Sequence, residues 1–179
     1  MQIAETLLKS RHLQKQEMER IACQAVKAPA TFKALLSLME PGQPELAGRA
    51  AWCFSQAAKL KPDWAKAEEA ALVRVLEKPG LSDGVLRNTL RVLRDVTLDP
   101  ANFDQLVFHC FNFIEDTDRP VAIRAFAMHI LGQIGCHIAD IRPEVKAIIE
   151  YHFENGAPGL RSAGKAVLRV WEKPAYKSK

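Results

Sequence analysis

Apolar residues recur along the chain at the three- and four-residue spacing of amphipathic helices. Residues 83–98 and 141–153 show this spacing most clearly, and proline and glycine fall between such segments rather than inside them. No stretch combines strict alternation of apolar and polar residues with an excess of β-branched residues, so no strand is predicted. The pattern predicts an all-α chain of about ten helices, at residues 2–10, 14–27, 30–40, 44–59, 63–77, 83–98, 103–115, 119–137, 142–154 and 158–172.

An arginine returns near the start of every second predicted helix from 44–59 onward. These arginines are Arg49, Arg87, Arg124 and Arg161, and successive members are 38, 37 and 37 residues apart. A unit of two helices that repeats about every 37 residues is typical of an α-solenoid, in which each repeat packs on its neighbours. The period therefore predicts an all-α repeat protein.

The repeat pattern resembles that of the HEAT-repeat family, which belongs to the armadillo-like superhelices. The best copy, residues 118–135, matches the family's inter-helix aspartate and proline and the apolar helix that follows them, through Asp118, Pro120, Val121, Arg124, Ala125, Leu131, Gly132 and Ile134. The resemblance covers roughly residues 29–173 and implies a right-handed α-α superhelix of about four helical hairpins. We expect a single solenoid domain over residues 1–179, with N-terminal cap helices at 1–28 and a flexible tail at 174–179.

The resemblance also implies a structural role for the repeated arginines. In the family, the turn aspartate and the helix arginine of neighbouring repeats form a hydrogen-bonded ladder. Carried over to this sequence, the ladder would contain Arg49, Asp83, Arg87, Asp118 and Arg124. An arginine on an otherwise apolar helix needs a charged partner, and its planar guanidinium suits a carboxylate. Arg124 is therefore expected to pair with Asp118 or with a neighbouring acid of a turn.

Two of the second helices carry further basic residues, each set on one helical face. One stripe, on the predicted helix 83–98, contains Arg87, Arg91 and Arg94, and the other stripe, on 158–172, contains Arg161, Lys165 and Arg169. Second helices line the concave side of a solenoid, so both stripes are expected to face one groove that suits phosphates or an acidic peptide. The alternative is that both are ordinary solvated helix faces, and Asp95, four residues past Arg91, partly neutralises the first.

No recognised catalytic, cofactor or metal-binding motif occurs in the sequence. The four cysteines are single, the histidines form neither H-x-x-x-H nor H-E-x-x-H, and the glycine-rich phosphate-binding motifs are absent. The sequence thus predicts a protein without enzymatic activity, cofactor or metal. Cysteines on apolar helical stretches are expected to be buried reduced thiols, which favours the cytoplasm. No secretory signal or transmembrane segment is recognised, so no membrane association is expected.

A formal net charge of +4 permits a polyanionic partner without demanding one. The sequence favours a non-catalytic interaction or scaffold module that binds an acidic segment of another protein on its concave face. Nucleic-acid binding is the alternative. It includes a resemblance to HEAT-like alkylpurine DNA glycosylases, whose groove residue types are supplied here by Trp52, Arg91, Arg94 and Asp95. The identity of the partner and the oligomeric state stay open.

Overall fold

The computed structural model of the chain describes residues 2–8 and 14–173. Within these residues every regular element is a helix, which confirms the all-α prediction. The α-helices are α1 (Gln2–Leu8), α2 (Lys15–Ala25), α3 (Pro29–Ser37), α4 (Pro44–Leu60), α5 (Pro62–Ala67), α6 (Glu69–Leu76), α7 (Asp83–Asp95), α8 (Phe103–Glu115), α9 (Val121–Ile134), α10 (Arg142–Asn155) and α11 (Pro158–Trp171). The predicted tail at 174–179 lies outside the described residues.

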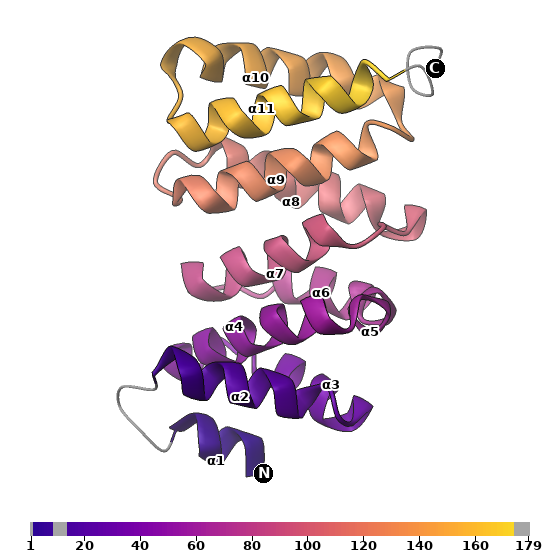
Figure 1. Cartoon of the computed structure of the whole chain (residues 1–179). Coiled ribbons are helices and arrows are strands. Elements are labelled where there is room, and N and C mark those ends of the chain that lie inside the picture. The colour runs from indigo at the N-terminus through magenta and orange to yellow at the C-terminus, as the bar shows by residue number, and fades with distance from the viewer. Residues whose placement is uncertain (1, 9–13, 174–179) are drawn as a thin grey trace. The chain divides into compact units, whose positions relative to one another are not determined.

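The chain divides into two compact units, Met1–Thr97 and Leu98–Lys179. In the first unit α4 packs against α2, α3 and α7, and α6 packs against α7; in the second, α9 packs against α8 and α11, and α10 against α11 (Figure 1). Each unit therefore contains antiparallel hairpins whose second helices, those with the repeated arginine, pack on one another. The predicted single domain and the right-handed superhelix stay predictions.

Small side chains and aromatic rings share the core of the first unit. Ala47, Ala50, Ala51, Ala57 and Ala58 of α4 are all buried, and their small size lets neighbouring helices approach α4 closely. Phe54 of the same helix is 0% exposed, and its ring centroid lies 4.5 Å from that of Phe32 in α3. Phe32 in turn meets Trp64 of α5 edge-on at 5.7 Å. These rings join the three helices α3, α4 and α5.

Two glycines bring α9 and α11 together in the second unit. A Cβ atom at Gly132 would lie 2.6 Å from a methyl carbon of Val167, and one at Gly135 would lie 2.5 Å from the Trp171 ring. Both distances are shorter than any normal carbon–carbon contact, so only glycine permits this spacing of the two helices. The Trp171 indole N–H then donates to the Gly132 carbonyl oxygen at 2.8 Å within the buried interface.

The predicted helix 63–77 is wrong in one respect, because the structure has two helices there. The break falls at Glu68, whose φ of −98° and ψ of 9° lie outside the helical range. Glu68 forms an ion pair with Lys33 of α3 at 2.8 Å, whereas the adjacent buried Glu69 pairs with Lys66 at 2.5 Å. The two neighbouring carboxylates therefore turn toward different partners, and the chain changes direction between α5 and α6.

Candidate functional site

The first of the two basic stripes, which we call the α7 stripe, lies on a helix whose other side is buried. Arg87 is exposed, whereas Arg91 and Arg94 are half-buried. Asp95 does neutralise part of the stripe, but its partner is Arg94, whose Nε and Nη2 atoms both lie 2.7 Å from the Asp95 Oδ1 atom. The Arg91 Nη1 atom donates to the Asn88 Oδ1 atom at 3.1 Å. The three guanidinium groups of the stripe therefore differ. That of Arg87 is exposed to solvent, that of Arg91 is hydrogen-bonded to Asn88, and that of Arg94 is ion-paired with Asp95.

Asn88 links this stripe to α4. It is 2% exposed, and its Nδ2 atom donates to the Gly84 carbonyl oxygen at 2.8 Å. The Ser55 hydroxyl of α4 lies 3.2 Å from the same Asn88 Oδ1 atom that accepts from Arg91. Sequence reasoning missed Asn88 and Ser55, although a polar amide on the apolar face of 83–98 was a signal for a buried hydrogen-bonded group.

A pocket of about 230 Å³ opens beside Arg91 between α4, α5 and α7. We call it the Arg91 pocket; its walls are Ser55, Ala58, Lys59, Pro62, Ala65, Arg91, Val92, Asp95 and Val96. The pKa of Arg91 is lowered below the ordinary value of arginine first by burial and then by the like charges of Arg87 and Arg94, with Asp95 acting in the opposite direction. Arg91 still carries its charge at neutral pH. The surroundings of Arg91 thus have an excess of positive charge.

The other basic stripe, which we call the α11 stripe, lies on α11 in the second unit. Arg161, Lys165 and Arg169 are all exposed, and the opposite face of α11 is buried through Leu160, Ala163, Gly164, Val167 and Trp171. Among residues 2–8 and 14–173, none of the three cations forms an ion pair or a side-chain hydrogen bond. The three cations therefore lie on the exposed side of α11. That the two stripes line one groove stays a prediction.

The expected pair of Arg124 and Asp118 is wrong. The Arg124 Nε atom donates instead to the carbonyl oxygen of Ile114 at 2.9 Å, and Asp118 is exposed. Ile114 lies in the last turn of α8, where carbonyl groups have no donor within the helix, so the guanidinium satisfies a helix C-terminus. Asp83 is exposed in the first turn of α7, as Asp118 is in its turn.

Arg49 makes the same kind of contact in the first unit. Its Nη1 atom donates to the carbonyl oxygen of Leu7, in the last turn of α1, at 2.6 Å, and its Nη2 atom pairs with Glu45 at 2.5 Å. Arg142 repeats the contact with the Gly135 carbonyl oxygen at the end of α9, at 2.6 Å. These three arginines share a backbone carbonyl as their partner. The structural role that the resemblance implied for Arg49 and Arg124 stays a prediction.

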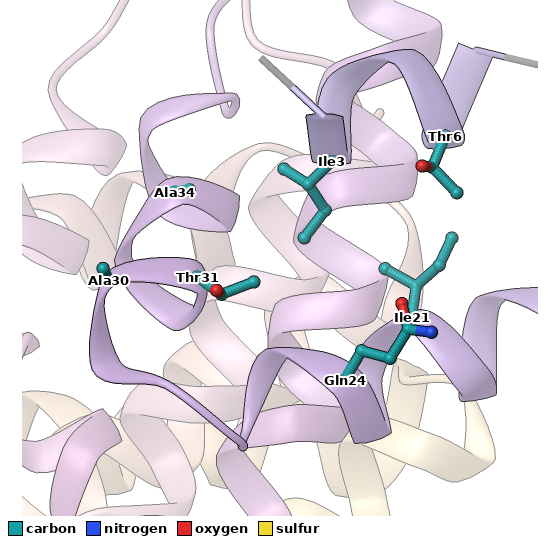
Figure 2. Close-up of a pocket in the computed structure, with 7 residues that line it drawn as sticks. All are labelled: Ile3, Thr6, Ile21, Gln24, Ala30, Thr31 and Ala34. Atoms are coloured by element: carbon teal, nitrogen blue, oxygen red, sulfur yellow. The ribbon is translucent and has the colours of Figure 1, made fainter.

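A second hollow, of about 590 Å³, lies between α1, α2 and α3. Figure 2 shows Ile3 and Thr6 of α1 and Ile21 and Gln24 of α2 on one side of it, with Ala30, Thr31 and Ala34 of α3 across from them. None of these seven side chains is charged. The hollow therefore offers no group that would select a charged ligand, unlike the Arg91 pocket.

Three of the four cysteines are buried, as expected, but Cys23 is exposed on α2. Burial raises the pKa of the Cys53 thiol to about 12 and also raises the pKa of Cys110 and Cys136. These thiols are protonated at neutral pH and are poor nucleophiles. In the described part of the chain, no three His, Cys, Asp or Glu residues are grouped so as to hold a metal ion.

His152 of α10 is a buried titratable group, 5% exposed, whose Nδ1 atom has no hydrogen-bond partner among the described residues. Burial, and then the charge of Arg124, lowers its pKa below the ordinary 6.5. The unfolded chain therefore binds the proton more readily than the folded chain, and folding stability present above pH 6.5 is lost as the pH falls below it.

We expect the His152→Leu variant to lose less stability than the natural chain between pH 7.5 and 5.5, because leucine has no proton to bind. Urea unfolding followed by circular dichroism at both pH values measures the difference. His129→Leu, a substitution of a half-buried histidine on α9, is the control. If the free energy of unfolding fell equally between pH 7.5 and 5.5 in the His152→Leu variant and in the natural chain, the prediction would be contradicted.

Paired helices, repeated arginines and stacked second helices define the class as an α-helical repeat protein. A model of the HEAT repeat domain matches residues 4–170, and the chain belongs to the HEAT-repeat family. No curated protein and no solved structure matches the chain. The family is generally non-enzymatic and its repeats generally mediate protein interaction, so this chain is a helical repeat module for scaffolding or interaction. None of the described helices is both long enough and apolar enough to span a bilayer.

Proposed function

We propose that the protein binds an acidic segment of another protein through the α7 and α11 stripes, by shape and charge and without chemistry. One observation carries the proposal. Four exposed cations of these stripes, Arg87, Arg161, Lys165 and Arg169, have no ion-pair partner among residues 2–8 and 14–173. A carboxylate brought to within 4 Å of such a cation gains roughly 1 kcal/mol even at the dielectric constant of water. Several such contacts along one helix face support binding of a flexible acidic segment.

The acidic residue within the α7 stripe also favours a protein segment over a nucleic acid as the partner. The α7 stripe holds a carboxylate, Asp95, within its own surface, so an ion-paired acidic residue interrupts its row of cations. Trp52, the aromatic residue of the glycosylase alternative, is half-buried in α4, and Asp95 of that alternative is ion-paired with Arg94. An acidic peptide needs only a few separate contacts and tolerates such an interruption.

The test is the affinity of a fluorescein-labelled hexaglutamate peptide, measured by fluorescence anisotropy at 50 and 200 mM salt. We expect Arg87→Glu combined with Lys165→Glu to weaken binding at least ten-fold, because each substitution turns an attractive contact into a repulsive one. The control, Arg20→Glu with Lys27→Glu, makes the same change of net charge at exposed positions on and just after α2. It should change the affinity less than three-fold.

Two results would overturn the proposal. One is equal loss of affinity in both double variants, because the net charge rather than the stripes would then determine binding. The other is tighter binding of a 12-base-pair DNA duplex than of hexaglutamate at both salt concentrations, with an affinity that falls steeply with salt. That second result would establish the nucleic-acid alternative.

A further inference from the structure

We infer that the Arg91 pocket receives the carboxylate of a glutamate side chain from the acidic partner segment. The inference rests on the proposed function and adds to it the side chain that the protein selects. It uses a site that neither the family nor the repeat pattern assigns. The pocket between α4, α5 and α7 is small, and its walls contain a set of apolar side chains, two cations and one ion-paired acid.

The apolar residues of the pocket wall suit the methylene groups of a ligand side chain. Ala58, Ala65, Val92 and Val96 are all buried and contribute only carbon side chains to the walls. A phosphate or sulfate ion has no apolar part to place against them. A glutamate side chain has two methylene groups and an aspartate one, and burying one more methylene corresponds to about four-fold in affinity. The apolar part of the pocket wall therefore favours glutamate over aspartate.

The charged walls suit the carboxylate at the end of the glutamate side chain. Arg91 lines the pocket, and its hydrogen bond to the Asn88 Oδ1 atom restrains the guanidinium there before any ligand binds. Lys59 of α4 supplies a second cation on the same pocket. The acid in the wall, Asp95, already accepts two donors from Arg94 and so presents little net negative charge.

The electrostatic surroundings of Arg91 act in the same direction. Arg87 and Arg94 lie about one helical turn before and after it, and their charges add to the effect of burial, which is the larger cause of its lowered pKa. An anion bound beside Arg91 relieves this like-charge repulsion, because it interacts favourably with all three guanidinium groups. The pocket thus gains more from a bound carboxylate than a single surface arginine would.

The first experiment fills the pocket without altering the charge. Ala58→Leu places an isobutyl group in the wall of the Arg91 pocket, and Ala30→Leu makes the same change in the uncharged hollow between α1, α2 and α3. The probes are fluorescein-labelled hexaglutamate and hexaaspartate. We expect the natural chain to prefer hexaglutamate at least four-fold. Ala58→Leu should abolish the preference and weaken hexaglutamate binding ten-fold, whereas Ala30→Leu should change neither.

A second variant keeps the test valid if Ala58→Leu does not fold. Arg91→Met removes the charge and keeps a long stem, and Arg20→Met is the matched control at an exposed position. We expect Arg91→Met to lose the preference for hexaglutamate and Arg20→Met to retain it. Thermal unfolding by circular dichroism establishes which variants are folded before their affinities are compared.

The possible failures are distinguishable. If hexaglutamate and hexaaspartate bind equally well, or Ala58→Leu binds as the natural chain does, the pocket assignment is overturned while the double variant of Arg87 and Lys165 still reports on the stripes. If the natural chain binds neither peptide, the proposed function is overturned as well. If free glutarate binds as tightly as hexaglutamate, the pocket takes a small dicarboxylate, and its assignment to a protein segment is overturned.

Discussion

The Trp171→Ala variant is expected to unfold with a free energy about 3–5 kcal/mol below that of the natural chain. Trp171 is 6% exposed and fills the space that Gly135 leaves open against α9. Its indole N–H satisfies the buried Gly132 carbonyl oxygen, and the Arg142 guanidinium carbon lies 5.7 Å from its ring centroid. Alanine leaves a cavity, an unsatisfied carbonyl and an arginine without its aromatic surface. Urea unfolding followed by circular dichroism measures the loss.

Trp171→Phe separates the contributions to this loss. Phenylalanine keeps one six-membered aromatic ring and lacks the indole N–H donor, so the expected loss is smaller, about 1–3 kcal/mol, mainly the cost of an unsatisfied buried group. A Trp171→Ala variant as stable as Trp171→Phe would show that the packing of the ring against α9 contributes little, contrary to the contacts of Gly135.

Phe54→Ala is the second substitution with a large expected effect, again a loss of about 3–5 kcal/mol in the free energy of unfolding. Phe54 is 0% exposed, and its ring contacts Phe32, which in turn contacts Trp64. Removing the ring leaves a cavity where α3, α4 and α5 meet. Because those helices belong to the first unit, hydrogen exchange should rise in α3 and α4 before it rises in α9.

Phe108→Ala is the matched control, because it deletes the same side chain from a residue that is 65% exposed on α8. We expect it to change the free energy of unfolding by less than about 0.5 kcal/mol. Equal losses for Phe54→Ala and Phe108→Ala would mean that burial does not determine the cost of removing the ring, which would contradict the described core.

Helical spacing predicted most of the fold because each amphipathic segment reports its own buried face. The break at Glu68 escaped prediction, since no proline or glycine marks it and the ion-pair partner of Glu68, Lys33, is remote in sequence. Cys23 was likewise predicted to be buried from its apolar neighbours, yet α2 exposes it. A local pattern shows that a helix has an apolar face, but the burial of a residue near the edge of that face depends on the helices packed against it.

The candidate site was predictable only in its surface charges. The spacing of the α11 stripe placed its three cations on one exposed face, as the structure has them. The Arg91 pocket could not be predicted, because its walls come from three helices and its key link joins Ser55 to Asn88 across 33 positions of sequence. The partner of Arg124 was equally hidden, since a backbone carbonyl has no signature of its own in the sequence.

The arginine contacts with helix ends also bear on how such a chain changes during evolution. Arg49 and Arg124 bind the carbonyl oxygens of Leu7 and Ile114, and every residue type presents the same oxygen. The contact therefore places no demand on the side chain at position 7 or 114. Compensating substitutions between each arginine and its partner position are not needed. These two repeats can therefore diverge at the partner position while the arginine is retained, whereas the arginines of the other two repeats, Arg87 and Arg161, are exposed.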